Sequence, residues 1–335
     1  MKALADDAMT NGSNNYDKWL AEYERLRVSA ARMINASPRE IATVKNTSEG
    51  IATVALGIDW KSGDRIVAFN EEFPANYFPW KRLESRGVQI EWLNANDPLE
   101  RIEQTVRGAR LLTISYVQYL SGFRADLNAI GAICERHGCC FFVDAIQGLG
   151  VFPLDVEAAK ISALSADGHK WLLGPEGCGI LYVRQSWQDA IEPVEFGWTN
   201  VARYADYASR DMTLRSDAGR YECGTLNTIG IFGLRASIDF LLEVGIEQIS
   251  RAVQRNADIL AEGAVAKGYE VLGNRTPETG AGIVSIRKQG IESPYVVRQL
   301  KDKKMIGAPR QGWIRLSPHF YASGDEMMEV VEALP

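Results

Sequence analysis

The most informative stretch of this chain is Ser165-Ala-Asp-Gly-His-Lys170-Trp-Leu-Leu-Gly-Pro-Glu-Gly-Cys-Gly-Ile-Leu-Tyr-Val183. An apolar strand leads into a His-Lys pair, and a turn rich in glycine and proline then leads into a second apolar strand. This order places one lysine amine on a stiff loop at the edge of a sheet. A neutral amine condenses with an aldehyde, and burial lowers the pKa of an amine, so Lys170 is suited to covalent chemistry. Most lysines flanked by glycine are simply solvated, so this reading depends on the rest of the chain.

Length and charge restrict the class of protein. The chain has 335 residues, enough for a large domain with a smaller one appended. Its formal net charge is −6 and it has no basic block, so neither nucleic acid nor an anionic membrane surface is an expected partner. No apolar run approaches the roughly 18 residues that span a bilayer.

The five cysteines are not spaced as zinc ligands, and Cys139 and Cys140 are adjacent within a strand-like run. This pattern is typical of cysteines that are buried and remain reduced. We therefore expect a cytoplasmic protein with no bound metal and no membrane segment.

Short apolar strands alternate with helical stretches through the first two thirds of the chain. The expected strands are 65–69, 89–93, 111–117, 140–144, 163–165 and 179–183, and the expected helices are 15–36, 49–56, 77–86, 99–108 and 127–137. A further helix is expected to open at Ser37-Pro38-Arg39-Glu40, which has the sequence of a capping box. The alternation predicts an α/β fold with a mostly parallel sheet and helices on both faces. Such sheets bind ligands at the carboxyl ends of their strands.

The pattern changes beyond residue 224. Two long helices, 229–244 and 246–266, are followed by strand-like 281–287 and 312–317 and by a last helix over 324–334. We therefore predict three parts: an N-terminal helical segment over 1–36, a large domain over 37–228 and a smaller C-terminal α+β domain over 229–335.

Polar residues follow several of the predicted strands. Asp144 closes the strand over 140–144, with Gln147 three residues later. A buried aspartate needs a cationic partner, such as a protonated pyridine nitrogen, although a helix cap would also explain one. Asn46-Thr47-Ser48-Glu49-Gly50 opens a helix, where backbone amides can either bind a phosphate or simply be capped. Phe73 offers an aromatic face in the loop after another strand.

Together these residues resemble a known pattern. Asp144 with Gln147, followed one strand later by His169-Lys170, is similar to the pyridoxal 5′-phosphate (PLP) site of the class V aminotransferase family. This fold-type I group includes cysteine desulfurases, selenocysteine lyases and isopenicillin N epimerase-like proteins. Two further stretches match in the correct order, Arg220-Tyr-Glu-Cys-Gly-Thr-Leu-Asn227 and Arg315-Leu-Ser-Pro-His-Phe-Tyr321. The resemblance runs from about residue 38 to the end of the chain, and it implies the fold of PLP-dependent transferases of type I.

The resemblance also implies roles for single residues. Lys170 would form the Schiff base with the cofactor and move the Cα proton of the amino-acid substrate, and Asp144 would pair with the pyridine nitrogen. The other expected cofactor contacts are Gln147 at the ring oxygen, Phe73 in the place of a ring-stacking histidine, and Ser48, Glu49, Gly50 and His169 at the phosphate. Thr225 would reach the phosphate of the partner subunit, which implies a homodimer. Arg315 would grip the substrate carboxylate.

Several departures bear on the reaction. No cysteine follows Cys223, so the loop cysteine of desulfurases has no counterpart. Tyr119, in the run Ser115-Tyr-Val-Gln-Tyr119, looks more like the epimerase-like branch. Asp167 stands where many relatives have a phosphate-binding serine, and the sequence does not say where its charge goes. An Asn-rich stretch that relatives usually carry ahead of Tyr16 is also absent, so the chain could be a fragment, a natural short form or a degenerate member.

We therefore expect a PLP-dependent enzyme acting at Cα, by transamination or by C–S lyase chemistry that needs no protein thiol. One alternative is an epimerase of the isopenicillin N type, with Tyr119 as the proton donor opposite Lys170. Another is a catalytically silent PLP-binding protein. Four aromatic residues near the presumed site hint at an apolar or aromatic substrate: Tyr77, Trp80, Trp171 and Trp198. The sequence does not distinguish between these reactions or identify the amino acid.

Overall fold

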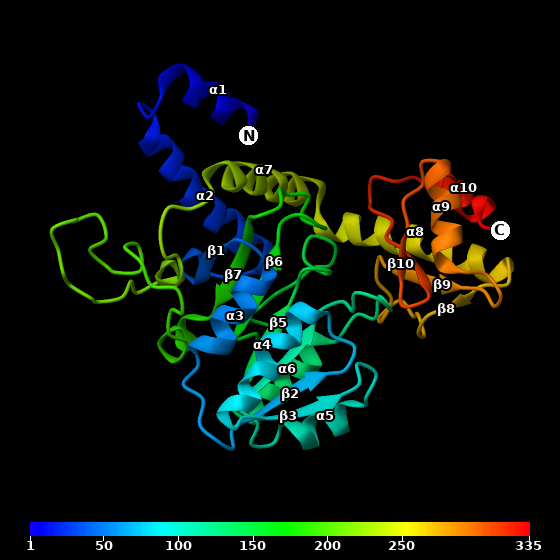
Figure 1. The fold of residues 1–335 in the computed structure, drawn as a ribbon, viewed down its shortest axis with the longest axis horizontal. Coiled ribbons are helices and arrows are strands. Elements are labelled where there is room, and N and C mark those ends of the chain that lie inside the picture. The colour runs from blue at the N-terminus through cyan, green and yellow to red at the C-terminus, as the bar shows by residue number, and fades with distance from the viewer. The chain divides into compact units, whose positions relative to one another are not determined.

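The computed structural model describes residues 1–335 and divides the chain into two compact units (Figure 1). The first unit contains Met1–Tyr116 and Leu127–Glu243, and the second contains Val117–Asp126 and Val244–Pro335. The sequence predicted a boundary at residue 228 instead. The helix that begins at Thr228 packs with the first unit, and ten residues from the middle of the chain pack with the second, which a linear division cannot express.

The first unit carries the larger sheet. Its helices and strands are α1 (Lys2–Asn11), α2 (Tyr16–Ile34), β1 (Ile41–Val44), α3 (Thr47–Gly57), β2 (Arg65–Phe69), α4 (Phe78–Lys81), β3 (Gln89–Leu93), α5 (Leu99–Val106), β4 (Leu111–Ser115), α6 (Leu127–Arg136), β5 (Cys140–Asp144), β6 (Ala163–Asp167), β7 (Gly179–Val183) and α7 (Thr228–Val244). Short 3-10 turns lie at Pro38–Glu40, Pro74–Asn76, Arg82–Arg86, Gln185–Ala190 and Ala218–Tyr221.

The seven strands lie in the order β1-β7-β6-β5-β4-β2-β3. Strands β3, β2, β4, β5 and β6 pair in parallel, and β7 runs antiparallel both to β6 and to β1. Six of the seven strands therefore run in one direction, as the α/β pattern predicted, and their carboxyl ends meet at one edge of the sheet.

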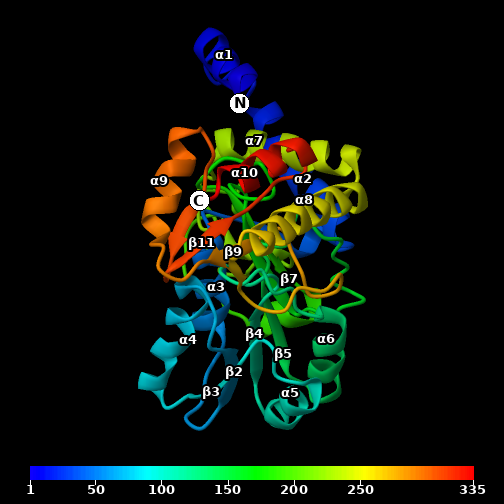
Figure 2. The same cartoon turned by 90° about the vertical axis from the view of Figure 1, so that its right-hand side faces the viewer.

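Helices cover both faces of this sheet. Gly50 of α3 packs so closely on Ser165 of β6 that an added Cβ would lie 2.2 Å from the serine Oγ, whereas Gly131 of α6 packs toward Phe141 of β5. Successive residues of a strand point to opposite faces, and Asp144 pairs with Ser165, so α3 and α6 lie on opposite faces and Asp144 points to the α3 side. Figure 2 shows the same division, with α3 and α4 on one side of the strands and α5 and α6 on the other.

Strand β1 was not predicted. The capping box at Ser37 and Glu40 forms as expected, but the helix that it opens is a 3-10 turn of three residues. The next residues, Ile41–Val44, are all buried and pair with β7, since a run with β-branched side chains suits a covered strand better than a helix. The prediction of the capping box was correct, but pairing with β7 made the residues after it a strand and not a helix.

The second unit is a smaller α+β body, as predicted. It contains α8 (Ile246–Ala266), β8 (Glu270–Val271), β9 (Val284–Arg287), α9 (Ser293–Asp302), β10 (Ala308–Arg310), β11 (Trp313–Leu316) and α10 (Gly324–Ala333). Its four strands lie in the order β10-β11-β9-β8 and are all antiparallel. One face of this sheet, with Val284, Ile286, Ile314 and Leu316, forms a core with α8, α9 and α10.

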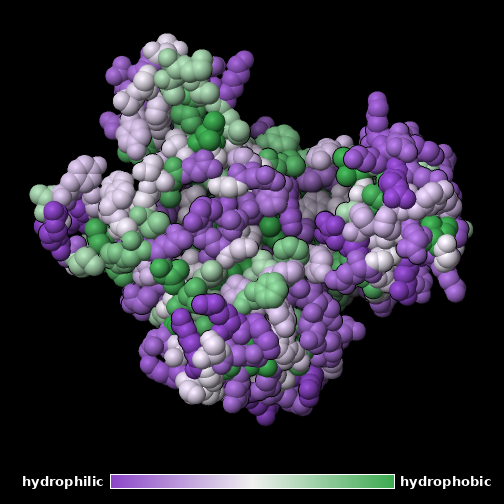
Figure 3. Space-filling view, in the orientation of Figure 1, coloured by the Kyte–Doolittle hydropathy of each residue, from purple (hydrophilic) through white to green (hydrophobic).

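Hydrophilic residues dominate the surface visible in Figure 3, and hydrophobic ones appear in scattered groups. None of the helices combines the length and the apolar character that crossing a bilayer requires.

Candidate cofactor and substrate site

The carboxyl ends of the parallel strands bring together three of the predicted site residues. Lys170 follows β6, and its Nζ lies 5.8 Å from the centroid of the Phe73 ring, which follows β2. The ammonium group of Lys170 also attracts the carboxylate of Asp144 at the end of β5. A lysine, an aromatic face and an acid, separated widely in the sequence, therefore share one edge of the sheet.

Asp144 is almost completely buried, with 2% of its surface exposed. Burial raises the pKa of its carboxyl to about 6, although a hydrogen bond from the Ile146 amide and the charge of Lys170 both lower that pKa. A buried carboxylate with so little compensation is stabilised by a cationic partner.

Gln147 is held by a neighbour of Lys170. Its Oε1 accepts a hydrogen bond of 2.9 Å from the indole Nε1 of Trp171, and both side chains are buried. Because the oxygen is engaged, the amide nitrogen is the end of Gln147 that remains to donate to another acceptor.

The start of α3 lies beside the strand that carries Lys170. Asn46 caps the helix by accepting from the Glu49 amide at 3.0 Å, and the buried Thr47 hydroxyl accepts from the Asp167 amide at 2.9 Å. The backbone amides of Thr47 and Ser48, in the first turn, have no acceptor within the chain. Free amides at a helix start favour an anion such as a phosphate.

The structure shows where the charge of Asp167 goes. Its Oδ2 lies 3.0 Å from Nδ1 of His169, so the carboxylate faces an imidazole. The other predicted phosphate contacts differ in their surroundings: Ser48 is exposed, whereas the side chain of Glu49 turns back to Lys45, which it contacts at 3.1 Å.

Glu72 is a buried residue of this edge that sequence reasoning missed. Its carboxylate accepts from the Ser115 amide at 2.7 Å and also from the Ser115 hydroxyl. Burial raises the pKa of Glu72 to about 7, the hydrogen bonds from Ser115 oppose that rise, and the charge of Asp144 adds to it. Since Ser115 pairs with Asp144 across the ladder, Glu72 ties the loop that carries Phe73 to the strand end beside Asp144. The only sequence signal was an acidic pair, Glu71-Glu72, which is usually solvated.

The predicted substrate residues Arg315 and Tyr119 lie in the second unit and contact each other. Nη1 of Arg315 donates to the carbonyl oxygen of Tyr119 at 2.9 Å, while Nε of Arg315 is buried without a hydrogen-bond partner. Burial and the nearby charge of Arg310 lower the pKa of Arg315.

The four aromatic residues that hinted at an apolar substrate have different surroundings. Trp80 is fully buried against Phe142, and Trp171 is bonded to Gln147. The Tyr77 ring stacks on Trp92 with centroids 4.7 Å apart. Trp198 contacts Tyr204 and Tyr207 in the loop between β7 and Ala218. Trp80 is therefore a core residue, whereas Trp198 remains 47% exposed.

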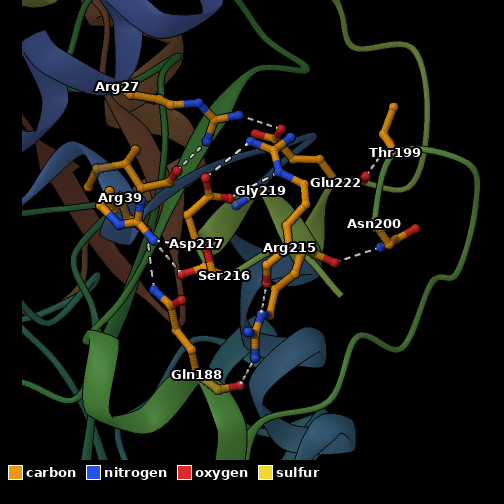
Figure 4. Close-up of polar contacts among 12 residues, drawn as sticks. Arg27, Arg39, Gln188, Thr199, Asn200, Arg215, Ser216, Asp217, Gly219 and Glu222 are labelled. Carbon is orange, nitrogen blue, oxygen red and sulfur yellow. Dashed lines mark hydrogen bonds and ion pairs between the residues drawn. The ribbon is translucent and has the colours of Figure 1, made fainter. Parts of the chain in front are cut away.

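The stretch Arg220–Asn227 is built on a buried ion pair. Arg27 of α2 contacts Glu222 at 2.5 Å, with only 6% and 4% of the two side chains exposed, and also donates to the Ile41 carbonyl (Figure 4). Glu222 in turn accepts from the Thr43 amide at 2.7 Å. Glu222 therefore joins α2 and β1 to the segment that leads to Thr225.

Arg220 has a similar structural position. It donates to the carbonyl oxygens of Gln188 and Arg215 at 2.9 and 2.8 Å, and its own carbonyl accepts from Asn200 at 2.6 Å. Figure 4 shows these partners, with Gln188, Asn200 and Arg215 gathered around the segment. Thr225 itself is exposed and forms no hydrogen bond within the chain.

The comparisons with known proteins agree with this geometry. The model of the family described as Aminotransferase class-V matches residues 8–312. The chain belongs to this family. Pyridoxal 5′-phosphate is accordingly its cofactor, and it is an enzyme of the PLP-dependent aminotransferase and lyase class.

Three proteins similar to this class V aminotransferase illustrate the range of names found among its relatives. A probable cysteine desulfurase of Methanothermobacter thermautotrophicus is 32% identical over 93% of this chain and 82% of its own length. An uncharacterized aminotransferase, YcbU, of Bacillus subtilis is 29% identical over 99% of this chain and 89% of its own. The apo structure of a cysteine desulfurase from Thermococcus onnurineus has a TM-score of 0.89 at 28% identity, covering 94% of this chain and 83% of that one.

The residues present fit the cofactor. Asp144 offers a buried carboxylate in need of a cation, Gln147 an amide donor, and the first turn of α3 free backbone amides. These match a pyridine nitrogen that carries a proton, a ring oxygen and a phosphate.

Replacing Glu222 with Gln should lower the free energy of unfolding by about 3–5 kcal/mol, because it leaves Arg27 charged and uncompensated in the interior. Denaturant unfolding measures this. Glu24→Gln is the matched control, since Glu24 contacts the same arginine at 3.3 Å but is 69% exposed, and it should have almost no effect. Equal losses in the two variants would contradict the structural role of Glu222.

Asp144→Asn should stabilise the protein freed of cofactor at pH 7.5 by on the order of 2 kcal/mol, while weakening its affinity for the cofactor. The sign follows from the pKa of Asp144, which is raised from 3.8 to about 6, so ionising this carboxyl costs more in the folded chain. Stability contributed by the neutral acid is complete below pH 4 and is lost as the pH rises through 6. Thermal unfolding between pH 4.5 and 8 should show the advantage of the variant shrinking toward acid. A pH-independent difference would contradict it.

Proposed function

We propose that Lys170, Asp144 and Phe73 form the catalytic centre of a PLP-dependent enzyme that acts at Cα of an amino acid. The observation that carries this proposal is their grouping at the carboxyl edge of the sheet, with Lys170 Nζ over the Phe73 ring and attracted to buried Asp144. When bound, the cofactor supplies an electron sink that stabilises negative charge at Cα.

The residues of the chain have separate tasks in this proposal. Lys170 anchors the cofactor aldehyde and moves the Cα proton as a general base. Asp144 keeps a proton on the pyridine nitrogen, and Gln147 donates to the ring oxygen. Phe73 packs against the ring.

The phosphate is assigned to the start of α3. The free amides of Thr47 and Ser48 point to this role, with the Ser48 hydroxyl and the backbone of Glu49 and Gly50 completing the turn. His169 joins them, because its Nδ1 faces Asp167 and Nε2 is then the ring nitrogen left to face the phosphate.

Arg315 is proposed to bind the substrate carboxylate. Its free, buried Nε together with its remaining Nη2 forms one edge of the guanidinium fork, which is the geometry that grips a carboxylate through two hydrogen bonds.

The reaction we favour is transamination or a C–S lyase step that uses no protein thiol. All five cysteines are free, four are buried, and Cys223 contacts Glu195 at 3.4 Å, where burial and that carboxylate raise the pKa of its thiol. A thiol kept protonated is a poor nucleophile. Epimerisation is the alternative, with Tyr119, whose hydroxyl accepts from Gln311 at 2.8 Å, as the proton donor opposite Lys170.

A homodimer in which Thr225 contacts the cofactor phosphate of the partner subunit belongs to the same proposal. It is supported by the exposed Thr225 side chain at the end of a rigidly held segment. Unpaired buried thiols are in keeping with a cytoplasmic location.

Borohydride reduction of the cofactor-loaded protein should leave the cofactor covalently attached to the peptide that contains Lys170. Lys170→Ala should fold and bind cofactor without this attachment and should lose turnover. Lys160→Ala, which removes a surface lysine ion-paired with Glu135, is the control and should behave like the parent. Mass spectrometry of the digested protein reads the result, and an unmodified Lys170 peptide would sink the assignment.

Incubation of the loaded protein with a panel of amino acids, in the absence of any keto acid, should separate the reactions. Conversion of the cofactor to its pyridoxamine form, read by absorbance, would identify a transaminase and its donor. Release of sulfide or of a keto acid without that conversion would identify a lyase, and an inverted stereocentre an epimerase. No change with any amino acid would contradict the enzymatic proposal and favour a silent PLP-binding protein.

A further inference from the structure

The second unit presents a row of charged residues on the outer face of its small sheet. Ile314 and Leu316 of β11 point into the core, so Trp313 and Arg315 point to the other face. The ladder pairs Arg310 with Trp313 and Ala308 with Arg315, which places Arg310 on the same outer face. Two arginines of one hairpin therefore lie side by side.

A third arginine on this face is neutralised, but these two are not. Arg287 of β9 forms an ion pair with Glu270 and stacks over the Trp313 ring at 4.3 Å. Neither Arg310 nor Arg315 has a carboxylate partner in the chain, since Arg310 donates only to its neighbouring Pro309 carbonyl and Arg315 only to the Tyr119 carbonyl. The charge of Arg310 is felt at Arg315 as a repulsion.

The hairpin holds the pair rigidly. Its two-residue turn, Gln311-Gly312, has positive φ at both positions, 48° and 82°, as tight hairpins of this type require. Gln311 also donates to the Tyr119 hydroxyl at 2.8 Å. The turn is therefore linked to Tyr119, whose carbonyl oxygen accepts from Arg315. Arg310 sits diagonally from Arg315, a spacing of about 7–8 Å between Cα atoms that long side chains bridge easily.

Two unneutralised guanidinium groups at this spacing match one small molecule with two anionic groups. Each guanidinium offers a fork of donors to a carboxylate, and an anion shared by both relieves their mutual repulsion. A substrate with a single carboxylate would leave the exposed Arg310 without a partner.

We propose that Arg310 makes the enzyme selective for amino acids whose side chain carries a second anionic group, a carboxylate or its sulfinate analogue. This rests on the proposed function, in which Arg315 binds the α-carboxylate. Arg310 then binds the side-chain anion, and Gln311 and Tyr119 are positioning residues that hold the two arginines in register.

The test compares acidic amino acids with their amide isosteres. For the loaded wild-type enzyme, KM for aspartate or glutamate should be at least about tenfold below KM for asparagine or glutamine, as expected for one charge-assisted hydrogen-bonded pair. Arg310→Gln should raise KM for the acidic members about tenfold, with kcat and the amide values within about twofold. Arg287→Gln removes a cation from the same face of the sheet and should leave all these values unchanged.

A binding measurement supplies a readout that does not depend on turnover. Succinate, titrated into the loaded protein by calorimetry, should bind the wild type and Arg287→Gln equally, and both Arg310→Gln and Arg315→Gln should weaken it about tenfold or more. Equal KM values for acidic and amide substrates, or succinate binding that is absent or indifferent to Arg310→Gln, would overturn the inference.

The two proposals fail in different ways. If no amino acid is turned over but succinate binding depends on both arginines, the proposed reaction fails while the two-arginine site stands. If amino acids react without preference and succinate does not bind, the reaction stands and the selectivity of Arg310 is refuted.

Discussion

A carboxyl group buried at the end of a strand imposes the strongest constraint on this molecule. Asp144 is 2% exposed and receives one backbone hydrogen bond together with the attraction of Lys170. An ionised group in such surroundings destabilises the folded chain, and that cost is offset when a cation binds beside it. In the proposed site, that cation is the protonated ring of the cofactor. The burial of Asp144, which weakens the protein alone, would then favour binding of the cofactor.

The loops around Asp144 are positioned by polar links that cross between strands. The Thr47 hydroxyl accepts a hydrogen bond from the Asp167 amide, and the Trp171 indole donates to the Gln147 side chain. The Glu72 carboxylate accepts from the Ser115 amide. Each link joins residues far apart in the chain, and each loop carries one of the groups assigned to the cofactor. Because the parallel strands end at one edge, these short contacts are enough to hold a lysine, an aromatic ring and a helix start together.

The second unit contributes a different kind of preorganisation. A tight hairpin turn fixes Arg310 relative to Arg315, and the Tyr119 carbonyl and hydroxyl hold both ends of the arrangement. Arg287, on the same face, is instead neutralised by an ion pair with Glu270. The difference between a neutralised and an unneutralised arginine is invisible in composition, and it depends on which carboxylates the sheet brings within reach.

Local signals were sufficient to predict much of the fold. Strands 65–69, 89–93, 140–144 and 179–183 were predicted with their observed bounds, because short apolar runs bounded by turn residues specify buried strands. One of these runs ends at Asp144, and Lys170 follows the next strand, so the strand ends and the family resemblance together predicted the site proposed here.

The remaining features depend on pairing between distant segments. Ile41–Val44 form a strand because they pair with β7, and the capping box before them opens only a short turn. Residues 117–126 belong to the second unit, although more than a hundred residues separate them from the rest of it. The sequence also did not predict three properties of charged side chains: the contact of Asp167 with His169, the burial of Glu72 and the lack of a carboxylate partner for Arg310. Amino-acid patterns determined which segments are helices and strands and which groups can react. Tertiary structure decided which charges are neutralised, because burial and distance are properties of the folded chain.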